Sequence, residues 1–94
     1  MIKANTAKEI ADISNMYIAP EVQLKVDSVF AEASTSIYHA ARKGRHSTEI
    51  DEWACYVDIN EVLKHLLSLI QEQGYTTEVE IDEKHHHFKI KIDW

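Results

Sequence analysis

The feature that most constrains the fold is a change of hydrophobic period between residues 58 and 94. After Asp58 the apolar residues recur at helical spacing and form a single face: Ile59, Val62, Leu63, Leu66, Leu69 and Ile70. Asp58 and Glu61 are spaced as an N-cap and N3 pair, and Gly74 supplies the residue that commonly ends a helix. After Gly74 the period falls to two, so this stretch predicts a helix followed by a β-hairpin.

The predicted hairpin covers residues 75–94, where apolar and charged residues alternate. The residues expected to face inward are Tyr75, Thr77, Val79 and Ile81 on one strand and Phe88, Ile90, Ile92 and Trp94 on the other. In the register that places Glu80 opposite Lys89, Glu78 also faces Lys91. Because opposite charges across a sheet stabilise it, the charge pattern and the apolar pattern predict the same register.

Two helices are predicted before residue 44. Thr6-Ala7-Lys8-Glu9 has the form of a capping box for a short first helix, which Ile10, Ile13 and Tyr17 make amphipathic. Pro20 should end that helix and begin a second one, which Gly44 ends. The second helix carries one apolar stripe: Val22, Val26, Val29, Phe30, Ala33, Ile37, Ala40 and Ala41. It would be roughly 36 Å long, more than is needed to cover one small sheet.

The opposite side of this long helix is small and weakly polar. It carries Leu24, Ala31, Ser34, Ser36 and Tyr38. Such a face is unusually apolar for a solvated surface, and its small residues allow a second helix to approach closely. We therefore expect a homo-oligomer interface at Leu24, Ala31, Ser34 and Tyr38. The alternative is that the short first helix folds back across the same face.

The remaining stretch completes an α+β prediction. Residues 46–52 are expected to form a strand, and residues 53–57 an irregular apolar connection to the next helix. No repeat or linker divides residues 1–94, so we expect one domain of order α-α-β-α-β-β. Its three-stranded sheet, in the order 1-3-2, should pack on helices that include the long second one.

Composition excludes several classes of protein. The formal net charge is −6, with 16 acidic and 10 basic side chains, which argues against non-specific nucleic-acid binding. A single cysteine excludes an internal disulfide. The chain opens without a signal peptide and has no long apolar run, so we expect a cytoplasmic protein that does not enter a membrane.

The most conspicuous cluster of metal-ligating residues is His85-His86-His87. Two of these histidines could hold a metal ion together with Asp82, Glu83 or His65. Zinc ligands normally converge from more widely spaced positions, and strand alternation points His86 and His87 to opposite faces. We therefore interpret the cluster as a polar turn and predict no metal and no cofactor.

Cys55 is the only thiol and precedes the helix that begins near Asp58, where the helix dipole could lower its pKa. A cysteine nucleophile also needs a base, and His46 or His65 can only be nominated for that role. The apolar residues 53–57 favour a buried, inert thiol. We therefore predict no catalytic residue and a protein that is not an enzyme.

The only basic concentration ends the long helix. It consists of Arg42, Lys43, Arg45 and His46. These side chains could bind an anionic ligand or an acidic partner, because arginine offers forked donors. They could equally offset the negative end of the helix dipole.

The chain also resembles a group of small, uncharacterised accessory proteins encoded by tailed bacteriophages. The resembling residues are Thr6-Ala7-Lys8-Glu9-Ile10, Lys43-Gly44, Gly74-Tyr75 and Ile92-Asp93-Trp94. The resemblance implies a phage accessory protein made in the bacterial cytoplasm, and it carries over no site residue. Our first hypothesis is a non-enzymatic, homo-oligomeric binder that inhibits a host protein. The alternatives are an oligomer that sequesters an anionic, nucleotide-like signal and, third, a small metal-dependent enzyme.

Overall fold

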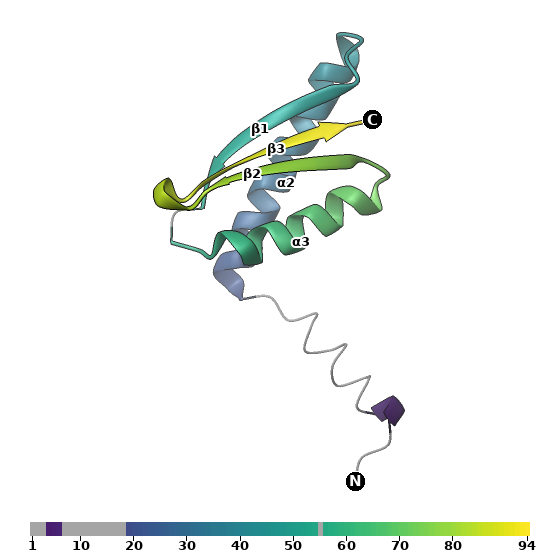
Figure 1. Ribbon diagram of the computed structural model, residues 1–94. Coiled ribbons are helices and arrows are strands. Elements are labelled where there is room, and N and C mark those ends of the chain that lie inside the picture. The colour runs from purple at the N-terminus through teal and green to yellow at the C-terminus, as the bar shows by residue number, and fades with distance from the viewer. Residues whose placement is uncertain (1–3, 7–18, 55) are drawn as a thin grey trace.

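The computed structural model describes residues 4–6, 19–54 and 56–94, and confirms the α+β fold (Figure 1). Its elements follow in the order α2 (Pro20–Arg42), β1 (Ser47–Trp53), α3 (Ile59–Glu72), β2 (Thr76–Asp82), a 3₁₀ turn (Glu83–His85) and β3 (His87–Asp93). Residues 4–6 are helical. The rest of the expected first helix, residues 7–18, lies outside the described residues.

The three strands form one antiparallel sheet in the order β1-β3-β2, as the sequence predicts. Glu80 pairs with Lys89 and Glu78 with Lys91, so the predicted hairpin register is confirmed. Because β3 is antiparallel to both neighbours, β1 and β2 are parallel to each other, and α3 connects them. The central position suits β3, whose alternate side chains are fully buried.

Helices α2 and α3 cover one face of the sheet (Figure 1). The core lies between these layers and consists of Val22, Val26, Val29, Ala33, Ile50, Ala54, Ile59, Val62, Leu63, Leu66, Ile70, Phe88, Ile90 and Ile92. Both helices are amphipathic at a period of 3.6, so the hydrophobic effect holds them against the apolar side of the sheet.

The helix ends follow local rules. Pro20 occupies the first turn of α2, where its missing N–H is not needed. At the other end Gly44 has φ +79°, and the amides of Gly44 and Arg45 donate to the carbonyls of Ala41 and Ala40, both at 3.0 Å. This is a Schellman arrangement, and it turns the chain sharply towards β1.

Helix α3 begins at its predicted cap, but without the full capping box. The Asp58 carboxylate accepts a hydrogen bond from the Asn60 amide at 2.8 Å. The Glu61 side chain points along the helix instead, with Oε2 3.6 Å from Nε2 of His65. The predicted N-cap, Asp58, is therefore confirmed. Glu61, the expected N3 partner in the capping box, instead faces His65 four residues later.

Two predictions on α2 are wrong. Ser36 was expected on the outer side, but its hydroxyl lies 2.6 Å from the Thr48 hydroxyl of β1. The reason is helical spacing, because Ser36 follows buried Ala33 by three residues and precedes buried Ala40 by four. Ala41, expected in the core stripe, is exposed.

Two hairpin side chains expected to face inward, Ile81 and Trp94, are exposed, and so are Trp53 and Tyr56 before α3. Ile81 is 44% exposed, because it lies near the end of edge strand β2. Trp53 is 57% exposed and Tyr56 is fully exposed, whereas Ala54 between them is buried. Strand alternation explains Trp53, since buried Ile50 and exposed Trp53 point to opposite faces of β1.

Candidate functional site

The outer face of α2 is exposed, as the sequence predicts. Leu24 is 72% exposed and Tyr38 is 58% exposed, and Ala31 and Ser34 lie exposed between them along the helix. The four residues predicted as an interface therefore occupy accessible positions.

A groove of about 390 Å³ runs beside this face. Its walls are Phe30, Ala33, Ser34, Ile37, Tyr38 and Ala41 of α2, Ile70 and Gln73 at the end of α3, and Tyr75 before β2. The groove lies where α2 and α3 diverge beneath the sheet and where α2 extends beyond α3 (Figure 1). Helix α2 has 23 residues and α3 has 14, so α3 is shorter by roughly 13 Å and cannot flank the last turns of α2.

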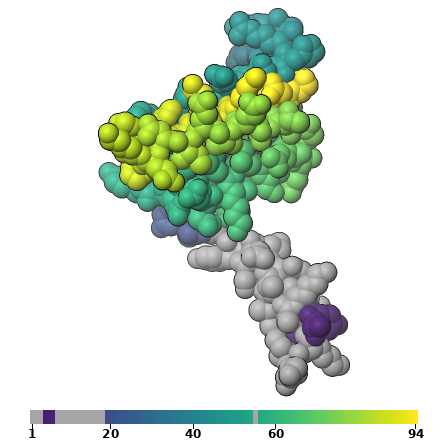
Figure 2. All heavy atoms as spheres, in the orientation of Figure 1, coloured from purple at the N-terminus to yellow at the C-terminus, as the bar shows by residue number. Residues whose placement is uncertain are grey.

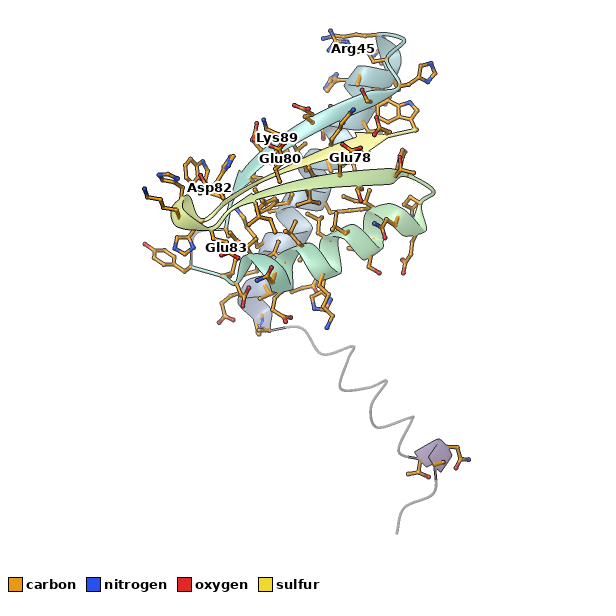
Figure 3. All side chains as sticks on the ribbon, in the orientation of Figure 1. Arg45, Glu78, Glu80, Asp82, Glu83 and Lys89 are labelled. Carbon is orange, nitrogen blue, oxygen red and sulfur yellow. The ribbon has the colours of Figure 1, made fainter. Side chains whose placement is uncertain are left out.

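The predicted basic cluster begins directly after Ala41, a residue of the groove wall, where α2 ends. Arg42, Lys43, Arg45 and His46 are all exposed. The end of α2 and the loop after it project beyond the sheet, with Arg45 at the tip (Figures 2 and 3). The Arg42 guanidinium carbon lies 5.7 Å from the centre of the Tyr38 ring. A cation therefore stands directly over an aromatic wall of the groove.

The opposite end of the domain carries aromatic and histidine side chains around the hairpin turn. The rings of Trp53 and His87 are 4.9 Å apart, and Nε2 of His87 lies 3.4 Å from Oδ1 of Asp51. Tyr56 extends fully into solvent and lines a shallow hollow with Trp53 and His86. The sequence pattern indicates only an apolar connection over residues 53–57, so it does not identify Trp53 and Tyr56 as surface residues.

The face of the sheet turned away from α2 and α3 is acidic. The carboxylates on it are Glu49, Asp51, Glu78, Glu80, Asp82 and Asp93, and the lysines are Lys89 and Lys91. In the register of the sheet each lysine stands between two carboxylates, as Lys89 does between Asp51 and Glu80. Figure 3 shows Lys89 and Glu80 side by side on this face. The acidic surplus continues to the hairpin end, where Asp82 lies opposite His87 and Oδ1 of Asp51 lies 3.4 Å from Nε2 of His87.

The hairpin turn is held by Asp82. Its carboxylate lies 2.7 Å from Nδ1 of His85 and accepts a hydrogen bond from the His85 amide at 3.3 Å. The hydrogen bond from the His85 ring lowers the pKa of Asp82 below its ordinary value. His86 then adopts a left-handed conformation with φ +50°. These contacts give His85 and His86 structural roles in the turn.

The described part of the chain does not bring the candidate metal ligands together. In the part of the chain that it describes, no three His, Cys, Asp or Glu side chains are placed to hold a metal ion. His65 lies on α3 beside Glu61; its Nε2 is buried and 3.6 Å from the carboxylate, which is long for a hydrogen bond. Cys55 lies outside the described residues.

A carboxyl pair joins α2 to β1. A hydrogen bond with Glu52 raises the pKa of Glu32, and desolvation and repulsion by Glu52 add to that shift. Burial acts to raise the pKa of Glu52 as well, but hydrogen bonds from Glu32 and Lys25 outweigh it and lower this pKa overall. Lys25 Nζ lies 3.3 Å from Glu52 Oε2. The pair lies outside the groove, so we assign it to the packing of α2 on the sheet.

Two further findings bear on the class of protein. Across residues 4–6, 19–54 and 56–94, none of the helices combines the length and apolarity that a bilayer span requires. No family model, curated protein or solved structure matches this chain.

Proposed function

We propose that this protein is a non-enzymatic binding protein that self-associates through α2 and acts by contact with another protein. One observation carries the proposal: large apolar side chains remain exposed on two separate surfaces. Leu24 and Tyr38 lie on α2, whereas Trp53 and Tyr56 lie at the hairpin end. Exposed apolar surface that a core does not use is typical of interaction sites.

The hairpin end is the surface we assign to the protein partner. Tryptophan and tyrosine are enriched among residues that dominate binding energy, because they bury a large rigid area at low entropic cost. On the same face of the sheet, Asp51 lies two residues before Trp53, and Asp82 lies opposite His87, the strand partner of Trp53. A partner with a basic surface and a recess for an aromatic ring would match this chemistry.

We further propose that this activity occurs in an infected bacterium, with a host protein as the partner and inhibition as the effect; the resemblance to phage accessory proteins supports this proposal. A binding role rather than catalysis is supported by the positions of the titratable groups with shifted pKa. Glu32, Glu52 and Asp82 lie at a helix–sheet junction and in a turn, and their partners explain their shifts. None of the three lines the groove.

A crossed pair of variants tests this assignment. Protein captured from bacterial lysate should retain one stoichiometric partner, and Trp53→Ala with Tyr56→Ala should release it without changing the subunit number in native mass spectrometry. Tyr38→Ala removes an aromatic ring from the other surface and should lower the subunit number. Recovery of no stoichiometric partner by the wild type would overturn the host-protein hypothesis.

A second candidate function is sequestration of an anionic, nucleotide-like molecule, and the groove favours it specifically. Tyr38, Tyr75 and Phe30 supply flat walls for a heteroaromatic base. Arg42 lies over Tyr38, next to Lys43 and Arg45, where it could meet phosphate oxygens. Aromatic side chains that could stack on a base therefore lie close to cations that could bind phosphate.

Ligand release separates this candidate from the first. A sequestering protein should yield a nucleotide-like absorbance on denaturation and a matching mass in native mass spectrometry. Arg42→Ala with Arg45→Ala should abolish retention, whereas Lys64→Ala with Lys84→Ala, which removes the same charge from other exposed positions, should leave it intact. Equal retention by the two double variants would contradict a phosphate site at the end of α2.

A further inference from the structure

We infer that two copies of this chain pair through α2 in an antiparallel, two-fold arrangement, with Leu24 of each copy entering the groove of the other. This inference rests on the proposed self-association and specifies its geometry. The occupant of the groove is then a second copy of the chain, and the contact closes on itself because each copy uses the same surface.

The first support is a continuous seam of exposed residues on α2. Leu24, Asp27, Ala31, Ser34, Tyr38 and Ala41 recur at alternating spacings of three and four, and all six are exposed. This spacing is that of residues which meet a neighbouring helix in a coiled coil. Ala31 and Ser34 lie in the middle of the seam, where small side chains allow the closest approach.

The second support is the shape of the seam. Leu24 lies seven residues before Ala31, and Tyr38 lies seven residues after it. An antiparallel pair that crosses near Ala31 and Ser34 places Leu24 of one copy beside Tyr38 and Ala41 of the other. Those two residues line the groove, whose walls are apolar enough to receive a leucine side chain. A parallel pair would instead set Tyr38 against Tyr38 and leave the groove open.

The third support is the distribution of charge along α2. In the first half of α2, Glu21 and Asp27 outnumber Lys25, which pairs with Glu52, whereas Arg42 ends the helix and Lys43 follows. Antiparallel packing brings the acidic half of one helix against the basic end of the other. Parallel packing would oppose like charges and align the two helix dipoles unfavourably. Charge and shape therefore favour the same orientation.

Cysteine cross-linking tests the orientation in the full-length chain, in a Cys55→Ser background with a short bismaleimide. Ala31→Cys lies near the two-fold axis and should give a covalent dimer. Leu24→Cys should not, because antiparallel packing separates the two Leu24 positions by roughly 25 Å along the helix axis. Glu32→Cys is the matched control, since it is adjacent to Ala31 but lies on the flank that meets Glu52.

Two outcomes would overturn the inference. Cross-linking at both Ala31→Cys and Leu24→Cys would show a parallel pair, and an oligomer in native mass spectrometry with no cross-link at Ala31→Cys would show that another surface pairs. In either case the proposed self-association would survive. A wild-type monomer at micromolar concentration would overturn both the antiparallel pairing and the proposed self-association.

Substitution provides an independent measurement. Leu24→Asp places a charge in the apolar groove of the partner, and Ala31→Glu places one at the crossing. Each should raise the dimer dissociation constant at least about tenfold, which corresponds to about 1.4 kcal/mol. Glu32→Ala should leave it unchanged. Unchanged dissociation constants in both seam variants, with folding intact by circular dichroism, would contradict the pairing, and would leave the groove for a nucleotide-like ligand.

Discussion

Ile50 of β1 and Ile90 of β3 are directly opposite each other in the sheet, and both side chains are buried. On the other side of Ile90 lies Val79 of β2. Ile90 therefore sits at the centre of the row that joins all three strands beneath the two helices.

Ile90→Ala should destabilise the fold by about 2–5 kcal/mol, because it removes a fully buried side chain and leaves a cavity. Lys89→Ala, its neighbour on the acidic face, should cost less than about 1 kcal/mol, because solvent screens the cross-strand charges. Urea denaturation of the two variants measures both values. A larger loss for Lys89→Ala would mean that the two faces of β3 are exchanged.

Glu32→Gln should stabilise the protein at neutral pH by less than about 1 kcal/mol, since the contact with Glu52 is largely exposed to solvent. The raised pKa of Glu32 means that its protonated form stabilises the fold, and that this contribution is lost as pH rises through the raised pKa. The lowered pKa of Glu52 has the opposite sign, so its contribution is lost in acid. The side-chain amide of the glutamine at position 32 can donate a hydrogen bond to Glu52 at every pH, and it removes the repulsion between the two carboxylates.

The advantage of Glu32→Gln over the wild type should therefore shrink as pH falls below the raised pKa of Glu32. Thermal unfolding of both proteins across a pH series measures this difference in stability. Glu32→Ala is the control, because it removes the repulsion without supplying a donor to Glu52. Equal pH profiles for the glutamine and alanine variants would show that the hydrogen bond contributes nothing.

Asp82→Asn should weaken the hairpin turn at neutral pH. The lowered pKa of Asp82 means that its carboxylate stabilises the fold above its ordinary pKa, and that this contribution is lost as pH falls through the lowered value. The wild type and the variant should thus differ in melting temperature at neutral pH and converge in acid. Glu83→Gln removes a neighbouring charge from the same turn and should show no such convergence.

Replacement of His85, His86 and His87 together by Asn should leave a folded protein, because asparagine tolerates the left-handed conformation at position 86 and can still hydrogen-bond at position 85. We also expect untagged wild-type protein to carry no stoichiometric metal. Elemental analysis that finds one zinc per wild-type chain and none in the variant would show that the turn is a metal site.

Secondary structure and strand register follow from the sequence because near neighbours encode them. The change of period after Gly74 predicts both α3 and the hairpin, and the charge pattern sets Glu80 opposite Lys89. Pro20 and Gly44 set the limits of α2 through backbone geometry alone. Each of these signals acts within a few residues, or across one tight turn, so no knowledge of the packing is required.

Tertiary structure alone decides which surfaces remain open. The groove depends on the difference in length between α2 and α3, and on the direction in which both cross the sheet. The exposure of Trp53 depends on which face of β1 the helices cover, and the contact between Glu32 and Glu52 on how α2 lies against that strand. Composition marks a residue as apolar or charged, but only the placement of elements distant in the sequence determines what covers it.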